Sequence, residues 1–385
     1  MKPLRLAIVR QRYTPFGGAE RFIDNALQAL GGQDGLEVSL IAREWRGASD
    51  ALSDGDTRPT VVLCRSFHIG RVWRQWAFSR AACKAIVEGR YDLVQSHERL
   101  ACCDVFRAGD GIHREWLRQR DRILPAWRRW LTWLSPFHHL LLAQERRMFA
   151  SPRLRTVIAI SRLVRDDILR HYPDTRARIE VIYNGVDLKR FHPSLRDLHR
   201  QAMRARYGIG DSSPLLLFVG SGFERKGLAT VIHALSGLPD EIRLIVAGKD
   251  GRRRYERLAE QLGVGQRVVF AGPQQNIEPF YGMADAFVFP SLYEPFGNVV
   301  LEAMASGLPA VVSETCGGAD LIDDRRFVLD ALDIPAWCEA IDAVLTGNRD
   351  GTLGRQARQR AETMTLDRMA MEMETLYCSL LGRGD

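Results

Sequence analysis

Two carboxylates flank a glycine in one short stretch of the chain, residues 290–309, which lies between two apolar runs. We expect Glu294 in a loop and Glu302 in a helix that begins near Gly297 or Asn298. A glycine lets the backbone approach a ligand closely, and the free N–H groups at a helix start bind anions. Acids that hold hydroxyls beside such an anion site suit a ligand with both phosphates and hydroxyls, and a nucleotide sugar is such a ligand.

A pair of cations follows another apolar run, at residues 215–219. Gly220 and Gly222 permit a tight turn there, and Arg225 and Lys226 come next, at the expected start of a helix. Two cations beside a helix start form a clamp for a diphosphate. A solvated charge pair is the alternative for such residues taken alone, and the two-acid stretch at the same sheet edge favours the clamp.

A double glycine, Gly17-Gly18, follows the first apolar run of the chain. Its surroundings do not match Gly-x-Gly-x-x-Gly, and no Lys-Ser or Lys-Thr pair follows, which excludes the dinucleotide and P-loop motifs. Gly18 either lets the backbone approach a phosphate or sugar or serves only as a tight turn, and the sequence leaves both open.

Short apolar runs alternate with helical patterns along the chain, which predicts parallel sheets covered by helices on both faces. We expect strands at residues 4–9, 38–42, 61–64, 93–96 and 157–160, then at 215–219, 243–247, 268–271, 286–289 and 310–312. Helices are expected at residues 18–30, 71–88, 161–171, 226–236 and 252–262, with Ser161 as an N-cap. The pattern indicates an α/β protein of two doubly wound, Rossmann-like domains, with ligands at the carboxyl ends of the strands in the cleft between them.

The domain boundaries follow from the length and from this alternation. A chain of 385 residues is too long for one ordinary core. We expect a first domain at residues 1–183, an interdomain connection at 184–213 and a second domain at 214–385. The helix-rich end of the chain, from residue 334 to about 381, closes the second domain in this scheme, and whether it crosses back to the first is left open.

The composition is that of a globular protein, with 46% hydrophobic and 26% charged residues. No apolar run approaches the ~18 residues of a membrane span, and the basic N-terminus is expected to be a strand and not a signal peptide. The seven cysteines are scattered without ligand spacing, which fits thiols in a reducing cytosol and argues against a zinc site. We also expect no acidic loop that holds a divalent ion, and therefore no metal.

Together these motifs resemble glycosyltransferase family 4, whose members are retaining enzymes with two Rossmann-like domains that face a cleft, the GT-B fold. The resemblance is carried by Phe-Gly-Gly at residues 16–18, Ile-Tyr-Asn-Gly-Val-Asp at 182–187, Arg-Lys-Gly at 225–227, the block at 294–309, and Gly317-Gly318. Within the family, the chain is similar to the lipopolysaccharide core glucosyltransferases that add the first glucose to inner-core heptose, through residues 15–18, 103–110 and 223–227.

The resemblance implies a role for each matching residue on the donor side. Arg225 and Lys226 would neutralise the diphosphate. Glu302 would bind the ribose hydroxyls, and Glu294 would face the donor sugar. The further donor contacts that it implies are Gly18, Gly222, Phe296, Gly297, Asn298 and Val299. It also implies transfer with retention, by a front-side attack in which the leaving phosphate helps to deprotonate the acceptor.

On the acceptor side, Asp110 matches an acid near the reacting sugar, at a position where many relatives in the family have a histidine. His97 and His113 lie close to it in sequence, so either of them is an alternative for this role. Asp110 therefore joins the two cations and Glu294 among the catalytic candidates.

Residues 112–150 carry eight arginines and three acids, a net charge of +5, together with four tryptophans. This composition fits a nucleic-acid surface, a helix pair packed by its tryptophans, or a patch at a membrane interface. No nucleic-acid motif accompanies it. Because arginine attracts anionic head groups and tryptophan favours the interface, we prefer the membrane patch. The residues expected to contact membrane or acceptor are Arg118, Arg122, Trp127, Arg128, Arg129, Trp130 and Trp133.

These observations lead to one expected function and two alternatives. We expect a cytoplasmic enzyme, peripheral to the inner face of the membrane, that moves a hexose, by resemblance glucose from UDP-glucose, to the inner-core heptose of lipopolysaccharide. It needs no cofactor besides the donor and no nucleic-acid partner. The alternatives are a mannosyl- or other hexosyltransferase with a lipid-linked or exopolysaccharide acceptor, and a non-catalytic module that binds a nucleotide sugar. The presence of both cations and both acids argues against the module, because loss of turnover should erode charged residues first.

Overall fold

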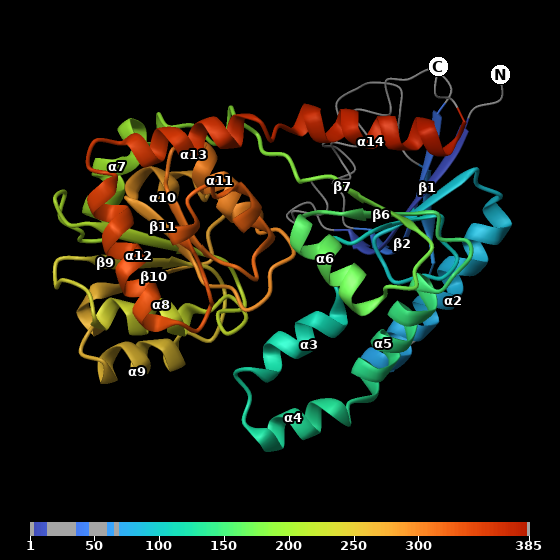
Figure 1. Ribbon diagram of the computed structural model, residues 1–385, viewed down its shortest axis with the longest axis horizontal. Coiled ribbons are helices and arrows are strands. Elements are labelled where there is room, and N and C mark those ends of the chain that lie inside the picture. Colours follow the sequence, from blue (N-terminus) through green and yellow to red (C-terminus); the bar gives the residue numbers. More distant parts are fainter. Residues whose placement is uncertain (1–3, 14–35, 46–59, 65–68, 383–385) are drawn as a thin grey trace. The chain divides into compact units, whose positions relative to one another are not determined.

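The computed structural model describes residues 4–13, 36–45, 60–64 and 69–382, which form two compact α/β units (Figure 1). The first unit comprises Met1–Tyr183 with Asp367–Asp385, and the second comprises Asn184–Leu366. Each unit is built on a parallel sheet, so the predicted class of two doubly wound α/β domains is confirmed. The boundary after Tyr183 coincides with the one expected from the sequence.

The first unit holds a seven-stranded sheet in the order β3-β2-β1-β4-β5-β6-β7. Its strands are β1 (Leu4–Tyr13), β2 (Leu36–Trp45), β3 (Thr60–Leu63), β4 (Leu93–Ser96), β5 (Val105–Arg107), β6 (Thr156–Ala159) and β7 (Arg178–Val181). Its described helices are α2 (Gly70–Gly89), α3 (His113–Asp121), α4 (Ala126–Trp133), α5 (Pro136–Phe149), α6 (Arg162–His171) and α14 (Leu366–Leu380). The strand order reverses between β1 and β4, and ligands of doubly wound sheets bind at the carboxyl ends of the strands at such a point.

The second unit holds a six-stranded sheet in the order β10-β9-β8-β11-β12-β13. Its strands are β8 (Leu215–Val219), β9 (Arg243–Ala247), β10 (Val268–Gly272), β11 (Ala286–Phe289), β12 (Ala310–Ser313) and β13 (Val328–Leu329). Its helices are α7 (Leu195–Arg206), α8 (Leu228–Ser236), α9 (Arg253–Gln261), α10 (Glu278–Met283), α11 (Asn298–Ala305), α12 (Ile334–Gly347) and α13 (Thr352–Glu362), with three 3₁₀ turns at Gly265–Arg267, Gly317–Leu321 and Arg325–Phe327. Here the order reverses between β8 and β11.

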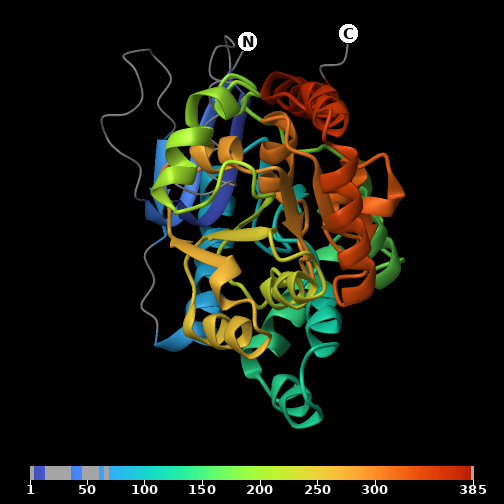
Figure 2. The ribbon, with the colours of Figure 1, turned by 90° about the vertical axis from the view of Figure 1, so that its left-hand side faces the viewer.

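Helices cover both faces of the second sheet, with α8 and α9 on the opposite side from α7 and α10 in two views (Figures 1 and 2). Phe218 of β8 and Val288 of β11 pack in one core with Trp337 of α12. The neighbouring residue of β11, Phe287, points the other way, and its ring centroid lies 6.2 Å from that of Tyr281 on α10. Because both faces are covered, the strands are continuous apolar runs, which made them recognisable in the sequence.

The predicted strands all lie among the described ones, but three short strands were not predicted. These are β5, with three residues, β13, with two, and β7, whose residues are exposed or half-buried. The predicted N-cap is confirmed, because the Ser161 side chain accepts a hydrogen bond from the Val164 N–H at 3.2 Å. The helix expected at residues 18–30 lies outside the described residues.

The prediction of a connection at residues 184–213 is wrong, since this segment is part of the second unit. Its helix α7 packs against α10. Arg204 of α7 is fully buried and donates to Asp285 Oδ2 at 2.6 Å and to the Gly210 carbonyl at 2.7 Å. This buried ion pair attaches the segment to the residue before β11. The polar composition of the segment gave no indication of such an attachment.

The open question about the end of the chain is answered by α14, which belongs to the first unit and not to the second. The Tyr377 hydroxyl donates to the Gln95 side chain of β4 at 2.5 Å, and Arg155 donates to the Leu380 carbonyl at 2.8 Å. The last helix therefore closes the first sheet.

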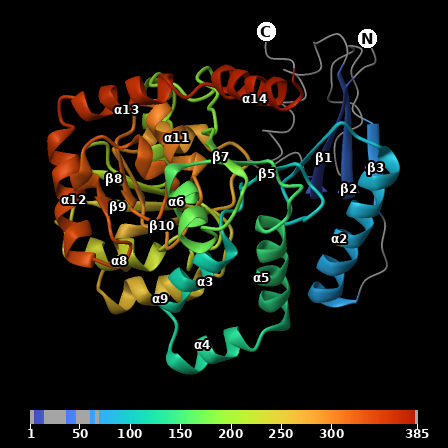
Figure 3. The ribbon, with the colours of Figure 1, turned by 45° about the vertical axis from the view of Figure 1, so that its right-hand side comes forward.

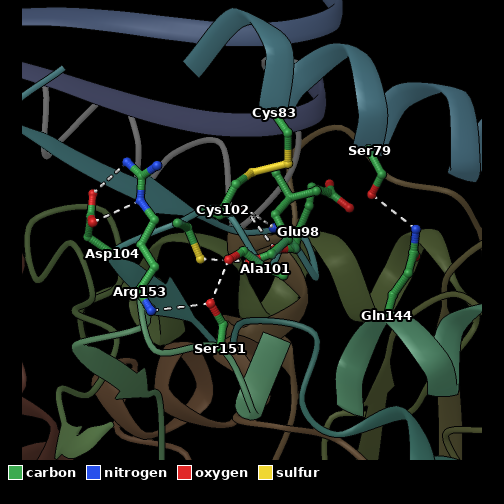
Figure 4. The surroundings of a disulfide bond; sticks show 12 residues. Ser79, Cys83, Glu98, Ala101, Cys102, Asp104, Gln144, Ser151 and Arg153 are labelled. Atoms are coloured by element: carbon green, nitrogen blue, oxygen red, sulfur yellow. Dashed lines mark hydrogen bonds and ion pairs between the residues drawn. A yellow bond between two sulfur atoms is a disulfide. The ribbon is translucent and has the colours of Figure 1, made fainter. Parts of the chain in front are cut away.

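The expectation of seven thiols is wrong for one pair, because Cys83 and Cys102 form a disulfide (Figure 4). Cys83 lies on α2 and Cys102 in the loop after β4, and the fold brings their Cα atoms to 5.8 Å, within disulfide range. The other five cysteines, all in the described residues, are free. The two cysteines are 19 residues apart, and no sequence pattern indicated that they would pair.

Candidate active site

Three loops of the second unit meet at the carboxyl ends of β8, β11 and β12. The loop after β8 carries Arg225, whose carbonyl accepts from the Leu292 N–H, in the loop after β11, at 2.8 Å. Glu294, further along the β11 loop, donates its N–H to the Thr315 carbonyl after β12 at 3.0 Å. These backbone bonds bring the residues of both predicted motifs to one edge of the sheet.

The three charged residues of these motifs form one ionic cluster. Arg225 Nη1 lies 2.7 Å and Lys226 Nζ lies 2.9 Å from the same atom, Glu294 Oε2. Burial would raise the pKa of Glu294, but the two cations outweigh it and hold the pKa below its usual value. The sequence assigned the cations and this acid to different parts of a ligand, and it did not predict that they pair with one another.

Glycines make room for this cluster. Arg225 and Lys226 lie in the turn before α8, so the helix start predicted at residue 226 is two residues too early. Gly227 caps α8 with φ 74°, and a Cβ there would lie 1.9 Å from the Pro290 carbonyl oxygen. A Cβ on Gly220 would lie 2.5 Å from Lys226 Cδ. Both positions therefore require glycine, for close approach and for a positive φ.

Helix α11 begins where the sequence predicted, with Gly297 as its cap at φ 83°. Phe296 is buried, and Asn298 and Val299 are half-buried in the first turn. Asn298 is held by Asn184, whose side chain donates to Asn298 Oδ1 at 2.7 Å. A cap without a side chain leaves the first amides of α11 to be satisfied by a ligand or by solvent, which suits an anion.

Glu302 lies on α11, beside a cluster of polar side chains that the sequence did not predict. The Tyr281 hydroxyl donates to Glu302 Oε2 at 2.9 Å. Burial, followed by the charge of Glu302, raises the pKa of Tyr281 well above its usual value, so this phenol stays protonated as a donor. Arg190 pairs with Glu278 next to them. No sequence pattern relates these residues, because they come from separate elements.

In the first unit, Asp110 is the exposed member of the three candidates for the acceptor side. It lies in the turn after β5 with 58% of its side chain exposed, and Arg10 Nη1 lies 3.4 Å from its Oδ2. His97 is buried beside Gln95, and burial lowers its pKa well below 6.5. His113 is buried against His138, and burial lowers its pKa from 6.5 to about 4. Both histidines are therefore buried and neutral.

An acid that the sequence did not single out lies next to Asp110. Glu98, in the loop after β4, accepts from the Gln11 N–H at 3.0 Å and lies 3.9 Å from Arg10 Nη1. Burial, as the largest influence, raises the pKa of Glu98, and the charge of Asp110 raises it further. Gly18, the other candidate of this unit, lies outside the described residues.

The basic, tryptophan-rich segment folds as α3, α4 and α5 (Figure 3), and every residue of α4 except the half-buried Thr132 is exposed. None of the eight residues of α4 is buried against the described part of the chain. Trp127, Trp130 and Trp133 are 60–65% exposed. The alternative of a helix pair packed by its tryptophans is therefore wrong for α4. The four arginines predicted to contact membrane or acceptor all have partners within the segment. Arg118 binds Glu115, Arg122 binds Gln119, Arg129 binds the Leu124 carbonyl, and Arg128 stacks on Trp127.

The beginning of α2 adds to this exposed surface. Trp73 and Trp76 are 52% and 42% exposed, with Ile69 and Val72 also exposed beside them. The Arg71 guanidinium lies 4.5 Å from the ring centroid of Phe137, which is in the first turn of α5, directly after α4. Both aromatic groups thus lie at the same end of the first unit (Figure 3).

A metal-binding cluster and a membrane-spanning helix are both absent from the part of the chain that the structure describes. Within residues 4–13, 36–45, 60–64 and 69–382, no three His, Cys, Asp or Glu side chains gather as a metal site requires. Among the described helices, none has the length and apolarity needed to cross a bilayer.

Two family models match this sequence. "Glycosyltransferase Family 4" matches residues 16–190, and "Glycosyl transferases group 1" matches residues 199–363. The chain is 29% identical over 325 residues to the lipopolysaccharide glucosyltransferase WaaG of Escherichia coli strain K12, 83% of each protein. It is 33% identical over 163 residues to the lipopolysaccharide core biosynthesis glycosyltransferase LpsE of Rhizobium meliloti strain 1021, 42% of this chain and 47% of LpsE. It is 35% identical over 256 residues to a D-inositol 3-phosphate glycosyltransferase of Xylanimonas cellulosilytica, 63% of this chain and 60% of that protein.

Solved structures have the same fold. A crystal structure of WaaG gives a TM-score of 0.78 at 24% identity, over 96% of this chain and 98% of WaaG. Anabaena Alr3699/HepE in complex with UDP-glucose gives a TM-score of 0.70 at 18% identity, over 98% and 100% of the two chains. These likenesses establish the fold, which is the GT-B type.

Proposed function

Because this chain belongs to glycosyltransferase family 4, we propose that it transfers a hexose from a nucleotide sugar to the core of lipopolysaccharide. The observation that carries the proposal is the cluster of Arg225, Lys226 and Glu294 beside the uncapped start of α11. Breaking the anomeric C–O bond builds negative charge on the leaving diphosphate. Two cations fixed in place before the reaction stabilise that charge without reorganisation.

The transfer proceeds with retention in this proposal. The acceptor hydroxyl attacks the anomeric carbon from the side on which the diphosphate leaves, and its proton passes to the leaving phosphate oxygen. Arg225 and Lys226 hold that phosphate, so they supply the charge that a divalent ion supplies in metal-dependent transferases. Glu294 then has two roles, to position the cations and to meet the hydroxyls of the sugar.

UDP-glucose is the donor that we propose. WaaG is a glucosyltransferase by name, and the Anabaena relative was solved with UDP-glucose. Glu302, which accepts from Tyr281 through Oε2, would bind the ribose hydroxyls. A different hexose remains the alternative, and the donor assay below separates the two.

Inner-core heptose is the acceptor that we propose, with Asp110 as the acid that faces the reacting sugar. The names of WaaG and LpsE support a lipopolysaccharide core acceptor. Asp110 is exposed and is held by Arg10 at the carboxyl end of the first sheet, where ligands of such sheets bind.

The enzyme acts at the cytoplasmic face of the membrane in this proposal, through α4 and the start of α2. Three exposed tryptophans on α4 and two on α2 lie among arginines at one end of the first unit. Such amphipathic helices insert their aromatic side chains at the interface while arginine binds anionic lipids.

A donor panel tests the chemistry. Purified protein is incubated with UDP-glucose, UDP-galactose or GDP-mannose and with a truncated lipopolysaccharide core, and the linkage in the product is determined by NMR. An α-linked glucose on heptose, formed also in the presence of EDTA, is the expected product. Transfer of mannose, or of any sugar to another acceptor alone, favours the alternative transferase, and donor binding without turnover favours the non-catalytic module.

Vesicle co-sedimentation tests the membrane surface. Replacing Trp127, Trp130 and Trp133 together with serine should abolish binding to phosphatidylglycerol vesicles and leave the fold intact, because none of them is buried. Leu198→Ser, at a 67% exposed position of the second unit, is the matched control and should bind normally. Equal, negligible binding of the unmodified protein to anionic and neutral vesicles would refute the proposal.

A further inference from the structure

A buried glutamate of α5, Glu145, lies beneath the turn that carries Asp110. Its side chain is 1% exposed. Its Oε1 accepts from the His113 N–H at 2.8 Å and from Arg99 Nε at 2.9 Å. Its Oε2 accepts from the Tyr172 hydroxyl at 2.8 Å and from the Arg114 N–H at 3.2 Å. A carboxylate that accepts from four donors on three other segments fixes those segments relative to one another.

Arg99 extends this network to the Asp110 turn itself. It lies in the loop after β4, and its Nη2 donates to the Gly111 carbonyl at 3.1 Å. Gly111 follows Asp110 at φ 65°, a conformation that glycine adopts without strain. The Gly111 carbonyl and the amides of His113 and Arg114 are thus held by one ion pair, Arg99–Glu145, immediately after Asp110.

We propose that Glu145 is a positioning residue for the reaction, which acts through Arg99 and the start of α3 to hold the Asp110 turn in place. This inference rests on the proposed function, since it assumes that Asp110 faces the reacting sugar. Asp110 itself has one described contact on the other side, from Arg10 at 3.4 Å. The turn would therefore be supported from two sides, and the Glu145 side holds its backbone in addition to the hydrogen bond from the Gly111 N–H to the Ala108 carbonyl at 3.1 Å.

The negative charge of Glu145 is needed because the Arg99 guanidinium is too little exposed for water to replace the carboxylate. The Arg99 side chain is 12% exposed, so removing the carboxylate leaves a largely buried guanidinium without its partner. Glutamine has the same shape, but its NH₂ group would face a donor where the carboxylate now accepts. Glu145→Gln should therefore loosen the turn while it keeps the volume of the core.

A second buried glutamate offers a matched control. Glu115 on α3 is 2% exposed and binds Arg118, Gln119 and His171, and among the described residues it forms no hydrogen bond or ion pair with the Asp110 turn. Glu115→Gln removes a buried charge of the same kind from the same unit. It should lower stability comparably and leave the turnover of the folded protein within about twofold of the unmodified enzyme.

The experiment compares Glu145→Gln, Asp110→Asn, their double mutant and Glu115→Gln in transfer assays below the unfolding midpoint of each. We expect Glu145→Gln to lower kcat/KM for the acceptor at least tenfold and to leave KM for the donor unchanged. The double mutant should be no slower than Asp110→Asn alone, because both changes act through one group.

Two results overturn parts of this scheme in different ways. If Asp110→Asn is impaired and Glu145→Gln is additive with it, or no slower than Glu115→Gln, the positioning role of Glu145 is wrong. If Asp110→Asn transfers sugar normally, the role of Asp110 in the proposed function fails, and the inference fails with it.

Discussion

Replacing Lys226 with alanine removes one of the two cations that meet at Glu294. Lys226 Nζ lies 2.9 Å from Glu294 Oε2, and 11% of its side chain is exposed. The ammonium also lies 4.6 Å from the ring centroid of Phe289, at the end of β11. The charge is thus fixed in the site before any donor binds, which is the condition for effective stabilisation of a transition state.

The loss of one such preorganised charge costs about 3–4 kcal/mol in the activation barrier. Since about 1.4 kcal/mol corresponds to a factor of ten in rate, we expect kcat to fall by roughly 10²–10³-fold. The fold should survive, because Arg225 Nη1 remains 2.7 Å from Glu294 and the carboxylate keeps one cation. The free energy of unfolding should therefore change by much less than the activation free energy of transfer.

The assay measures transfer at saturating donor and acceptor, with thermal unfolding of the same samples. Lys84→Ala is the control, because the Lys84 side chain is 76% exposed and forms only a surface pair with Glu88. It should change neither rate nor unfolding midpoint. If folded Lys226→Ala turns over within a few-fold of the unmodified enzyme, the assignment of the diphosphate to this cluster is refuted.

Three further changes test the fold around these sites. Gly227→Ala should lower the free energy of unfolding by about 1–3 kcal/mol, because its Cβ would lie 1.9 Å from the Pro290 oxygen at φ 74°; an unchanged urea midpoint would contradict this. Burial lowers the pKa of His113 from 6.5 to about 4, so the unfolded chain takes up the proton first and stability should fall by up to about 3 kcal/mol between pH 6.5 and 4. His113→Gln should flatten that pH profile, and an equally steep profile would show that other groups cause it. Cys83→Ser, which opens the disulfide to Cys102, should cost about 3 kcal/mol in urea unfolding, whereas equal midpoints for oxidised and reduced protein would exclude the bond.

The positions of the two charged motifs of the second unit were predictable because each depends on neighbours in the sequence. The apolar runs before Gly220 and before residue 290 define buried strands, and Gly297 marks the start of α11 at the predicted place. Local geometry of this kind is set by the dihedral preferences of a few residues and by the period of apolar side chains. The Ser161 cap is another case, confirmed by its bond to Val164.

The partners of these residues were not predictable, because they come from elements far apart in the chain. Glu294 meets cations that lie 68 and 69 residues away. Tyr281 of α10 binds Glu302 of α11, and Glu98, in the loop after β4, lies beside Arg10 of β1. A pairing of this kind depends on how loops from parallel strands converge, and no periodicity in one segment encodes it.

By itself, the sequence determined two doubly wound α/β units, the position of the two charged motifs after their strands, and an arginine- and tryptophan-rich segment. Only the tertiary structure decided which side chains are covered. It left Trp130 exposed, buried His97 and His113, and exposed Asp110. The physical reason is that burial and ion pairing depend on the elements packed around a residue, and a residue's own type and neighbours do not specify them.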